Sequence, residues 1–265
     1  MRSLTKYDRP QCHLKGTLRI SLSLLVLLIL SNRPASAQIT STAQLLDAMQ
    51  TKHRDKWFKA FTFTQETIRY NADRSVRDTA TWYEAIQYPD QFRIDFDDNG
   101  RFVIFDNDSS FRYENYNFQT ARLEPQEFLL FKGGMYYTPP SQVLKKLKEY
   151  GYDTSLFRND QFKGRNVYVI GAEEGDLKTK QFWIDADYFY TVRRISQVGG
   201  DRTLDVHYED HKRVKQGWVE QTVTFYLDEQ LRQIEYYLEI EAFDQLPSAM
   251  FNRTLPAKEW FRSPK

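Results

Sequence analysis

Cysteine is almost absent from this chain of 265 residues, in which the single example is Cys12. The sequence after residue 37 contains none, so a disulfide framework and thiolate chemistry are both excluded from it. Cys12 also precedes the longest apolar run instead of directly following it. It therefore cannot be the lipid-bearing first residue of a mature lipoprotein.

Long apolar runs are lacking as well. The longest mainly apolar stretch, from Ile20 to Leu30, has eleven residues, two of which are serines, and is about half of what a membrane-spanning helix needs. Basic residues precede it and Ala35-Ser36-Ala37 follows it, which is the pattern of a cleaved secretory signal. We predict a signal peptide over residues 1–37, and one exported domain over residues 38–265 that does not span a membrane.

The exported part has no strong excess of either charge. Residues 1–37 hold six of the 37 basic residues and one of the 36 acidic ones, so 31 basic and 35 acidic residues remain, with a net charge of −4. Nucleic acids and anionic membranes attract proteins with a basic surface. We expect neither as the main partner.

Recognisable catalytic motifs are also missing: there is no Gly-x-Ser-x-Gly turn, phosphate loop or dinucleotide fingerprint. His207 and His211 form a His-x-x-x-His pair in a predicted strand that runs into a turn. Four strand residues span roughly 13 Å, so the two rings cannot share one metal ion unless the chain bends sharply. We expect a solvent-facing structural pair, and neither metal nor cofactor.

Two acidic groups could in principle bind calcium or act as acids and bases. Each stands beside a glycine turn, which favours solvated loops. A catalytic pair could still be assembled from distant residues, so an enzyme remains the third hypothesis. The groups are Asp95, Asp97 and Asp98, and Glu173, Glu174 and Asp176.

Aromatic residues, by contrast, are abundant: 19 Phe, 5 Trp and 17 Tyr, nearly all after residue 37. They favour strands. Alternation of apolar and polar residues predicts ten or eleven short strands in meander order, with hairpins at Asn99-Gly100 and at residues 228–230. Helices are predicted only over Thr42 to Phe58 and Ser141 to Tyr150. The predicted fold is mainly β: a large curved antiparallel sheet that forms an incomplete barrel.

One predicted strand, Trp218 to Leu227, shows the alternation clearly. The positions expected to face the interior are Val219, Val223, Phe225 and Leu227. The positions expected to face outward are Glu220, Thr222 and Thr224.

The order of these segments resembles the outer-membrane lipoprotein carrier proteins of the LolA-like superfamily. The resemblance rests on the leading helix, the first strand Phe61-Thr62-Phe63-Thr64-Gln65-Glu66, the connection Tyr88-Pro89-Asp90-Gln91-Phe92-Arg93-Ile94 and the late Phe182-Trp183-Ile184-Asp185. It implies an incomplete barrel with helices in its open side and an apolar cavity. In that family the cavity receives the acyl chains of lipoproteins that cross the periplasm.

One residue departs from the family pattern. The best-known carriers have an arginine directly before the proline that corresponds to Pro89, and it holds the lid closed until cargo arrives. This chain has Tyr88 there, and a tyrosine cannot supply the forked charged donors of an arginine. The family's lid mechanism is therefore not carried over.

The cavity, if present, should be lined by inward-facing apolar residues, with a flap at its mouth. Residues 129–137 place apolar side chains around two glycines, which suits a mobile flap as well as a packed connection. The predicted mouth residues are Tyr88, Gly133 and Gly134. The predicted cavity residues are Phe61, Phe63, Phe92, Ile94, Phe96, Ile104, Leu130, Met135, Val223, Phe225 and Leu238.

Together these features predict a monomeric, non-catalytic periplasmic carrier for acyl chains of lipoproteins or other lipids, which exchanges them with donor and acceptor proteins of the envelope. The alternative is a non-catalytic sensor that recognises a protein or a lipid-linked partner and carries nothing. Ordinary core packing of the same apolar residues is the other reading that the sequence leaves open.

Overall fold

The computed structural model describes residues 38–96, 99–254 and 256. Two compact units make up the chain, Met1–Gln38 and Ile39–Lys265, and every described residue except Gln38 belongs to the second. The predicted signal peptide and the acidic residues Asp97 and Asp98 lie outside the described residues.

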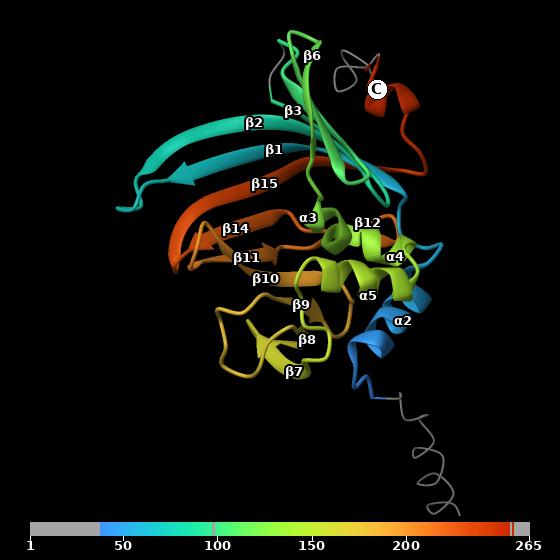
Figure 1. Cartoon of the computed structure of the whole chain (residues 1–265), viewed down its shortest axis with the longest axis vertical. Coiled ribbons are helices and arrows are strands. Elements are labelled where there is room, and N and C mark those ends of the chain that lie inside the picture. The colour runs from blue at the N-terminus through green and yellow to red at the C-terminus, as the bar shows by residue number, and fades with distance from the viewer. Residues whose placement is uncertain (1–37, 97–98, 255, 257–265) are drawn as a thin grey trace, which may run out of the picture. The chain divides into compact units, whose positions relative to one another are not determined.

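Thirteen antiparallel strands form one strongly curved sheet, in the order β6-β5-β4-β3-β2-β1-β15-β14-β11-β10-β9-β8-β7 (Figure 1). The sheet is open, because its edge strands β6 and β7 do not pair with each other. This confirms the predicted fold class. The strands are β1 Ala60–Tyr70, β2 Val76–Gln87, β3 Gln91–Asp95, β4 Phe102–Asp106, β5 Ser109–Glu114, β6 Asn117–Leu123, β7 Phe157–Phe162, β8 Arg165–Ile170, β9 Gln181–Asp185, β10 Thr191–Val198, β11 Arg202–Glu209, β14 Thr222–Leu227 and β15 Gln230–Phe243.

The chain builds this sheet as two meanders that meet in its middle. It starts at β1, winds outward to the edge strand β6, crosses to the opposite edge at β7 and winds back until β15 pairs with β1. A two-residue turn joins β14 to β15, and both of its residues, Asp228 and Glu229, have positive φ (50° and 63°), as such hairpins require.

The crossing between the edges carries helices into the curve of the sheet (Figure 1). Its first part, Glu127–Tyr137, consists of α3 (Glu127–Leu129), the π-helical turn η1 (Leu130–Gly134) and α4 (Met135–Tyr137); we name it the covering segment. Helix α5 (Pro140–Glu149) follows, with Pro140 at its first turn, and packs beside α2 (Thr42–His53). The larger hydrophobic core includes buried residues of α2, the covering segment, α5 and the inner face of the sheet.

A second, smaller core lies on the outer face of β2 to β5. Phe102, Ile104 and Tyr113 pack there with Met250 and Phe251 of the 3₁₀ turn η2 (Ser248–Phe251). Side chains alternate across a strand, so Val103 and Phe105 of the same β4 face the inner core instead. The sheet is therefore covered on both faces at this end.

The sequence missed both edge strands and a short ribbon. β6 is mostly exposed, and β7 is polar between its two phenylalanines and only partly buried, so neither shows a clear apolar alternation. The predicted strand Trp218 to Leu227 is divided: Gly217–Val219 is β13, which pairs with β12 (Lys212–Val214), and β14 begins only at Thr222. Helix α2 ends at His53, earlier than predicted.

The division of that strand changes which side chains are buried. Glu220 was expected outside, but it lies between β13 and β14 and is buried. Thr224 does lie on the outer face, opposite His207, although it is buried there. Asp95 was expected in a solvated loop, but it ends β3 and pairs with the fully buried Arg93. The expectations for Glu220 and Asp95 were wrong.

Candidate functional site

The curve of the sheet encloses a cavity of about 270 Å³. Six strands of the inner face and the neighbouring β3 supply most of its wall, and Phe128 and Lys132 of the covering segment supply the rest. This is slightly below the roughly 300–1,000 Å³ of typical small-molecule pockets. The cavity therefore has room for a small ligand.

Half of the lining residues are apolar. They come from four strands and from α3, and four of the eight carry aromatic rings. All except Phe128 lie on the inner face of their strands. These residues are Trp82, Phe92, Ile94, Phe128, Leu204, Val206, Val223 and Phe225.

The other half is polar and includes a buried lysine. Lys132 of η1 forms an ion pair with Glu220, and both side chains are less than 10% exposed (6% and 9%). Its ammonium also donates to the hydroxyl of Tyr237 at 3.0 Å, and that hydroxyl donates to Glu235 at 3.1 Å. The chain of contacts ties the covering segment to β15.

A second cation, Arg194 of β10, meets the covering segment from the other side. Its guanidinium donates to Glu127 at 2.8 Å, and Lys180 approaches the other oxygen of Glu127 at 2.5 Å. Both cations of the cavity wall therefore already have a carboxylate partner inside the protein.

Two carboxyl groups of the wall, Glu84 of β2 and Glu235 of β15, are in a different situation. Burial raises the pKa of Glu84 well above that of an ordinary glutamate, Glu235 raises it further, and Lys132 opposes the rise. Burial also raises the pKa of Glu235 to about 7, although Lys132 and the hydrogen bonds from Tyr237 and Gln233 lower it. Both carboxyl groups therefore hold a proton more tightly than an ordinary glutamate does, and Glu235 titrates near neutral pH.

The structure brings four of the residues predicted for a cavity together in this wall: Phe92 and Ile94 from β3, and Val223 and Phe225 from β14. The others divide into two groups. Phe61, Phe63, Phe96 and Met135 belong to the same core but do not line the cavity.

Two of the predicted residues lie outside this core altogether. Ile104 belongs to the core on the outer face, and Leu238 is 45% exposed. Leu238 was misplaced because β15 carries an extra residue opposite β1, between the pairs Thr62–Glu241 and Thr64–Leu238. Such a bulge reverses the alternation, so Glu235 and Tyr237 face inward before it, and Ile240 packs inward after it. Both predictions were therefore wrong.

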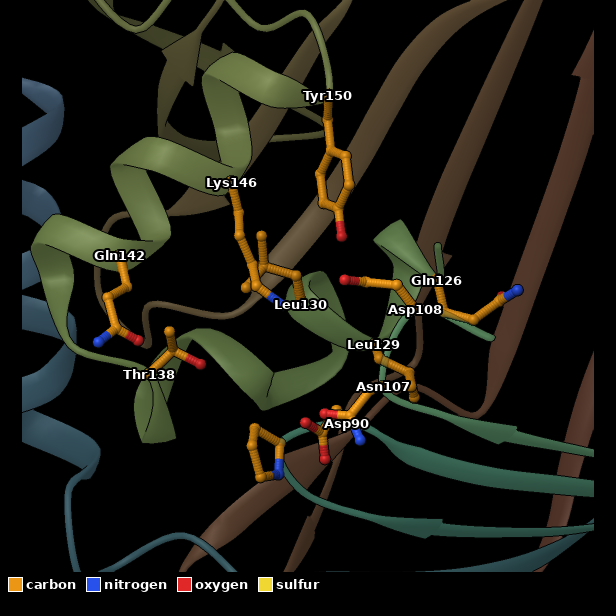
Figure 2. Close-up of a pocket in the computed structure, with 11 residues that line it drawn as sticks. Asp90, Asn107, Asp108, Gln126, Leu129, Leu130, Thr138, Gln142, Lys146 and Tyr150 are labelled. Carbon is orange, nitrogen blue, oxygen red and sulfur yellow. The ribbon is translucent and has the colours of Figure 1, made fainter. Parts of the chain in front are cut away.

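Leu130 lines a smaller, largely polar pocket of about 130 Å³ instead (Figure 2). Figure 2 shows Lys146 and Tyr150 extending from α5 toward the loop that carries Asp108. Asp90 lies on the opposite side, and partial burial together with Asp106 and Asp108 raises its pKa, while Lys146 opposes the rise. The pocket separates α5 and the covering segment from the turn between β4 and β5.

The predicted mouth residues meet at the covering segment. The hydroxyl of Tyr88 donates to the carbonyl oxygen of Lys132 at 2.6 Å, and its ring lies against Gly133. Gly133 has a φ of 142°, and an added Cβ would lie 2.9 Å from the Tyr88 ring, so a side chain is doubly disfavoured there. Gly134 lies close to the carbonyl of Leu129. Tyr88 thus holds the covering segment with a neutral hydrogen bond.

The histidines are dispersed. His207 contacts Asp205 and Phe162 on the outer face, whereas His211 stacks on Tyr190, with 3.7 Å between ring centroids. Burial lowers the pKa of His211 to about 4. Across residues 38–96, 99–254 and 256, no three His, Cys, Asp or Glu side chains are grouped to hold a metal ion.

The polar cavity residues were missed by the sequence analysis. A signal for one of them exists: Trp82, Glu84 and Ile86 alternate along β2, which puts the glutamate on the apolar side. Glu235 could not be found in this way because the bulge in β15 hides its face. Lys132 was assigned to a flap without a partner.

In the part of the chain that the structure describes, no helix is both long and apolar enough to cross a membrane. No family model matches the sequence, and no curated protein resembles it significantly.

Solved structures do resemble the chain, at low sequence identity. A LolA superfamily protein from Nitrosomonas europaea shares 12% identity over 81% of this chain and 98% of its own, with a TM-score of 0.54. A DUF1329 family protein from Desulfovibrio piger shares 13% over 80% and 96%, with a TM-score of 0.56. A domain assigned as an outer membrane lipoprotein-sorting protein from Vibrio parahaemolyticus shares 12% over 80% and 96%, with a TM-score of 0.54. The open curved sheet and these likenesses together give the chain a LolA-like fold.

Proposed function

We propose that this protein binds acyl chains of lipoproteins or other lipids in the cavity within the curved sheet and carries them through the periplasm, without catalysing a reaction. The observation that supports the proposal most is a partly apolar cavity of about 270 Å³ in the centre of the domain. A core packed to ordinary density leaves few voids larger than a water molecule.

The covering segment suits the entry of a chain. Phe128 and Lys132 form part of the cavity wall, and the segment is only three short helical turns around Gly133 and Gly134. Polar links such as that from Thr191 to the carbonyl of Phe131 at 2.9 Å, together with apolar contacts such as Phe128 with Phe92, hold the segment on the sheet. Movement of this segment would widen the cavity while the sheet stays in place.

The names of two structural neighbours support the same reading, since one belongs to the LolA superfamily and another is assigned to lipoprotein sorting. The periplasm is the proposed location, because the sequence before Gln38 has the pattern of a secretory signal.

A valine-to-arginine pair tests the proposal. Val223 is 1% exposed and lines the cavity, whereas Val76 on β2 is 56% exposed and does not. We expect Val223→Arg to weaken the binding of decanol at least tenfold, measured as displacement of the neutral fluorescent probe N-phenyl-1-naphthylamine. The loss of two methylene contacts, at about 0.8 kcal/mol each, suffices for that. Val76→Arg should bind as the unchanged protein does.

Thermal unfolding of both variants completes the experiment. An arginine can extend its charged end toward the open side of a cavity, so Val223→Arg should stay folded. If it folds and binds normally, the ligand does not occupy this cavity. If it fails to fold while Val76→Arg folds, the interior is packed core and the proposal is wrong.

A further inference from the structure

Two polar groups of the cavity wall are buried without a hydrogen-bond partner among the described residues, the Nε of Arg194 and the carboxyl group of Glu84. Glu84 is 4% exposed and lines the cavity. Among the described residues, no side chain or backbone group makes a hydrogen bond or an ion pair with the carboxyl group of Glu84. Glu235 and Lys132 act on this carboxyl group through their charges, at longer range. Buried polar groups almost always have a hydrogen-bond partner, so this one asks for an explanation.

The charged groups around Glu84 cannot supply that partner. The charged groups that act on Glu84 are Lys132 of the covering segment and Glu235 of β15. Glu220 is the ion-pair partner of Lys132. Lys132 is already occupied by Glu220 and Tyr237. Arg194, the other cation of the wall, pairs with Glu127 through one terminal nitrogen, while its Nε has no hydrogen-bond partner among the described residues. The group of Glu84, Glu220 and Glu235 therefore holds more carboxyls than its one lysine can pair.

Leaving such a group buried and unpaired costs about 1–3 kcal/mol, and a ligand that hydrogen-bonds it recovers that cost. We propose that the cavity takes an amphiphile whose inserted end carries a hydrogen-bond donor and no negative charge, such as a hydroxyl or an amine, and that Glu84 selects it. The inference rests on the proposed function, since it names the ligand class of the same cavity.

An anionic head group is the chemistry that this wall disfavours. A carboxylate placed at Glu84 would have to face Glu235 as well, and the two cations nearby are already paired. Like charges that meet in a desolvated site cost several kcal/mol. A hydroxyl or an ammonium, by contrast, can donate to Glu84 and keep its alkyl chain against Phe92, Val223 and the other apolar residues of the wall.

The test compares three ligands of equal chain length, decanol, decylamine and decanoate, as competitors of N-phenyl-1-naphthylamine at pH 8. Decanoate is fully ionised there. We expect decanol and decylamine to bind the unchanged protein at least tenfold more tightly than decanoate. Glu84→Leu and Glu84→Gln should each reduce that ratio below threefold, the first by removing the acceptor and the second by offering an amide donor to the carboxylate.

Val223→Arg separates this inference from the proposed function. Suppose that the ligands bind and that Val223→Arg abolishes their binding, but that the head-group ratio is absent or survives both changes of Glu84. The carrier proposal then stands, and the selectivity of Glu84 is overturned. If no ligand displaces the probe, or if Val223→Arg has no effect, both proposals fail. Glu84→Gln is nearly isosteric, so the test does not depend on the folding of Glu84→Leu.

Discussion

Two buried ionisable sites lie on neighbouring strands and on opposite faces of the sheet. On the outer face, Arg93 and Asp95 of β3 are 0% and 2% exposed, and two hydrogen bonds of 2.7 and 2.8 Å join them. Arg93 also donates to the carbonyl of Met250 at 3.0 Å and covers the ring of Phe102 at 4.3 Å. On the inner face, Glu84 of β2 lies opposite Ile94 and is equally buried, but unpaired.

The difference distinguishes a structural ion pair on the outer face from a candidate binding group on the inner face. The outer pair has its hydrogen bonds inside the protein and joins the sheet to η2, so it needs nothing more. The inner carboxyl opens onto a cavity, where a ligand can complete its hydrogen bonds. Burial alone does not mark a functional group; burial beside empty space without a partner does.

Breaking the outer pair should give the largest change in stability. Asp95→Ala leaves Arg93 buried and uncompensated, and we expect the free energy of unfolding to fall by about 3–5 kcal/mol in urea denaturation. Glu84→Gln on the adjacent strand is the matched control and should change it by less than about 1 kcal/mol. Equal losses in the two variants would remove the contrast between the faces.

The pH dependence of stability should report on the inner face. The pKa of Glu235 is raised from 4.5 to about 7, so the folded protein holds this proton more tightly than the unfolded chain does. Stability from this group is therefore full below about pH 4.5 and is lost as the pH rises through 7, by up to about 3 kcal/mol. Burial of Glu84 raises its pKa as well and acts in the same direction.

Urea unfolding at pH 5 and pH 8 measures this effect, with Glu235→Gln as the reference. We expect the unchanged protein to lose more stability over that interval than the variant, because glutamine does not titrate. Parallel curves for the two proteins would show that Glu235 ionises as easily in the fold as in the unfolded chain.

A smaller effect is expected at the covering segment. Tyr88→Phe removes the hydrogen bond to the carbonyl of Lys132, which should cost about 1 kcal/mol. It should speed hydrogen exchange in residues 127–137. Tyr150 lines the polar pocket beside α5 and is not among the residues that contact Gly133, so Tyr150→Phe is the control. Faster exchange in both variants, or in neither, would argue against Tyr88 as a tether of the covering segment.

Much of the fold followed from local signals in the sequence. Alternation predicted the inward positions Phe92, Ile94, Val223 and Phe225, and Asn99-Gly100 marked the turn between β3 and β4. Alternation failed wherever the backbone departs from a regular strand. The bulge in β15 placed Leu238 outside and Glu235 inside, and the break after β13 buried Glu220.

The polar half of the candidate site was beyond such reasoning. A glutamate in a strand is ordinarily assigned to the solvent side, because burying a charge is costly. Glu84 and Glu235 are buried because a distant segment supplies Lys132 and because a cavity lies beside them. Partners that are brought together from more than 40 residues away leave no periodic trace in the sequence.

The central claim is that the cavity holds an acyl-bearing molecule, and native mass spectrometry of the protein isolated from its own cells tests it most directly. We predict a one-to-one complex whose added mass fragments into a molecule with an acyl chain, kept in Val76→Arg and lost in Val223→Arg. A bare protein mass in the unchanged protein, or the same adduct on folded Val223→Arg, would contradict the claim.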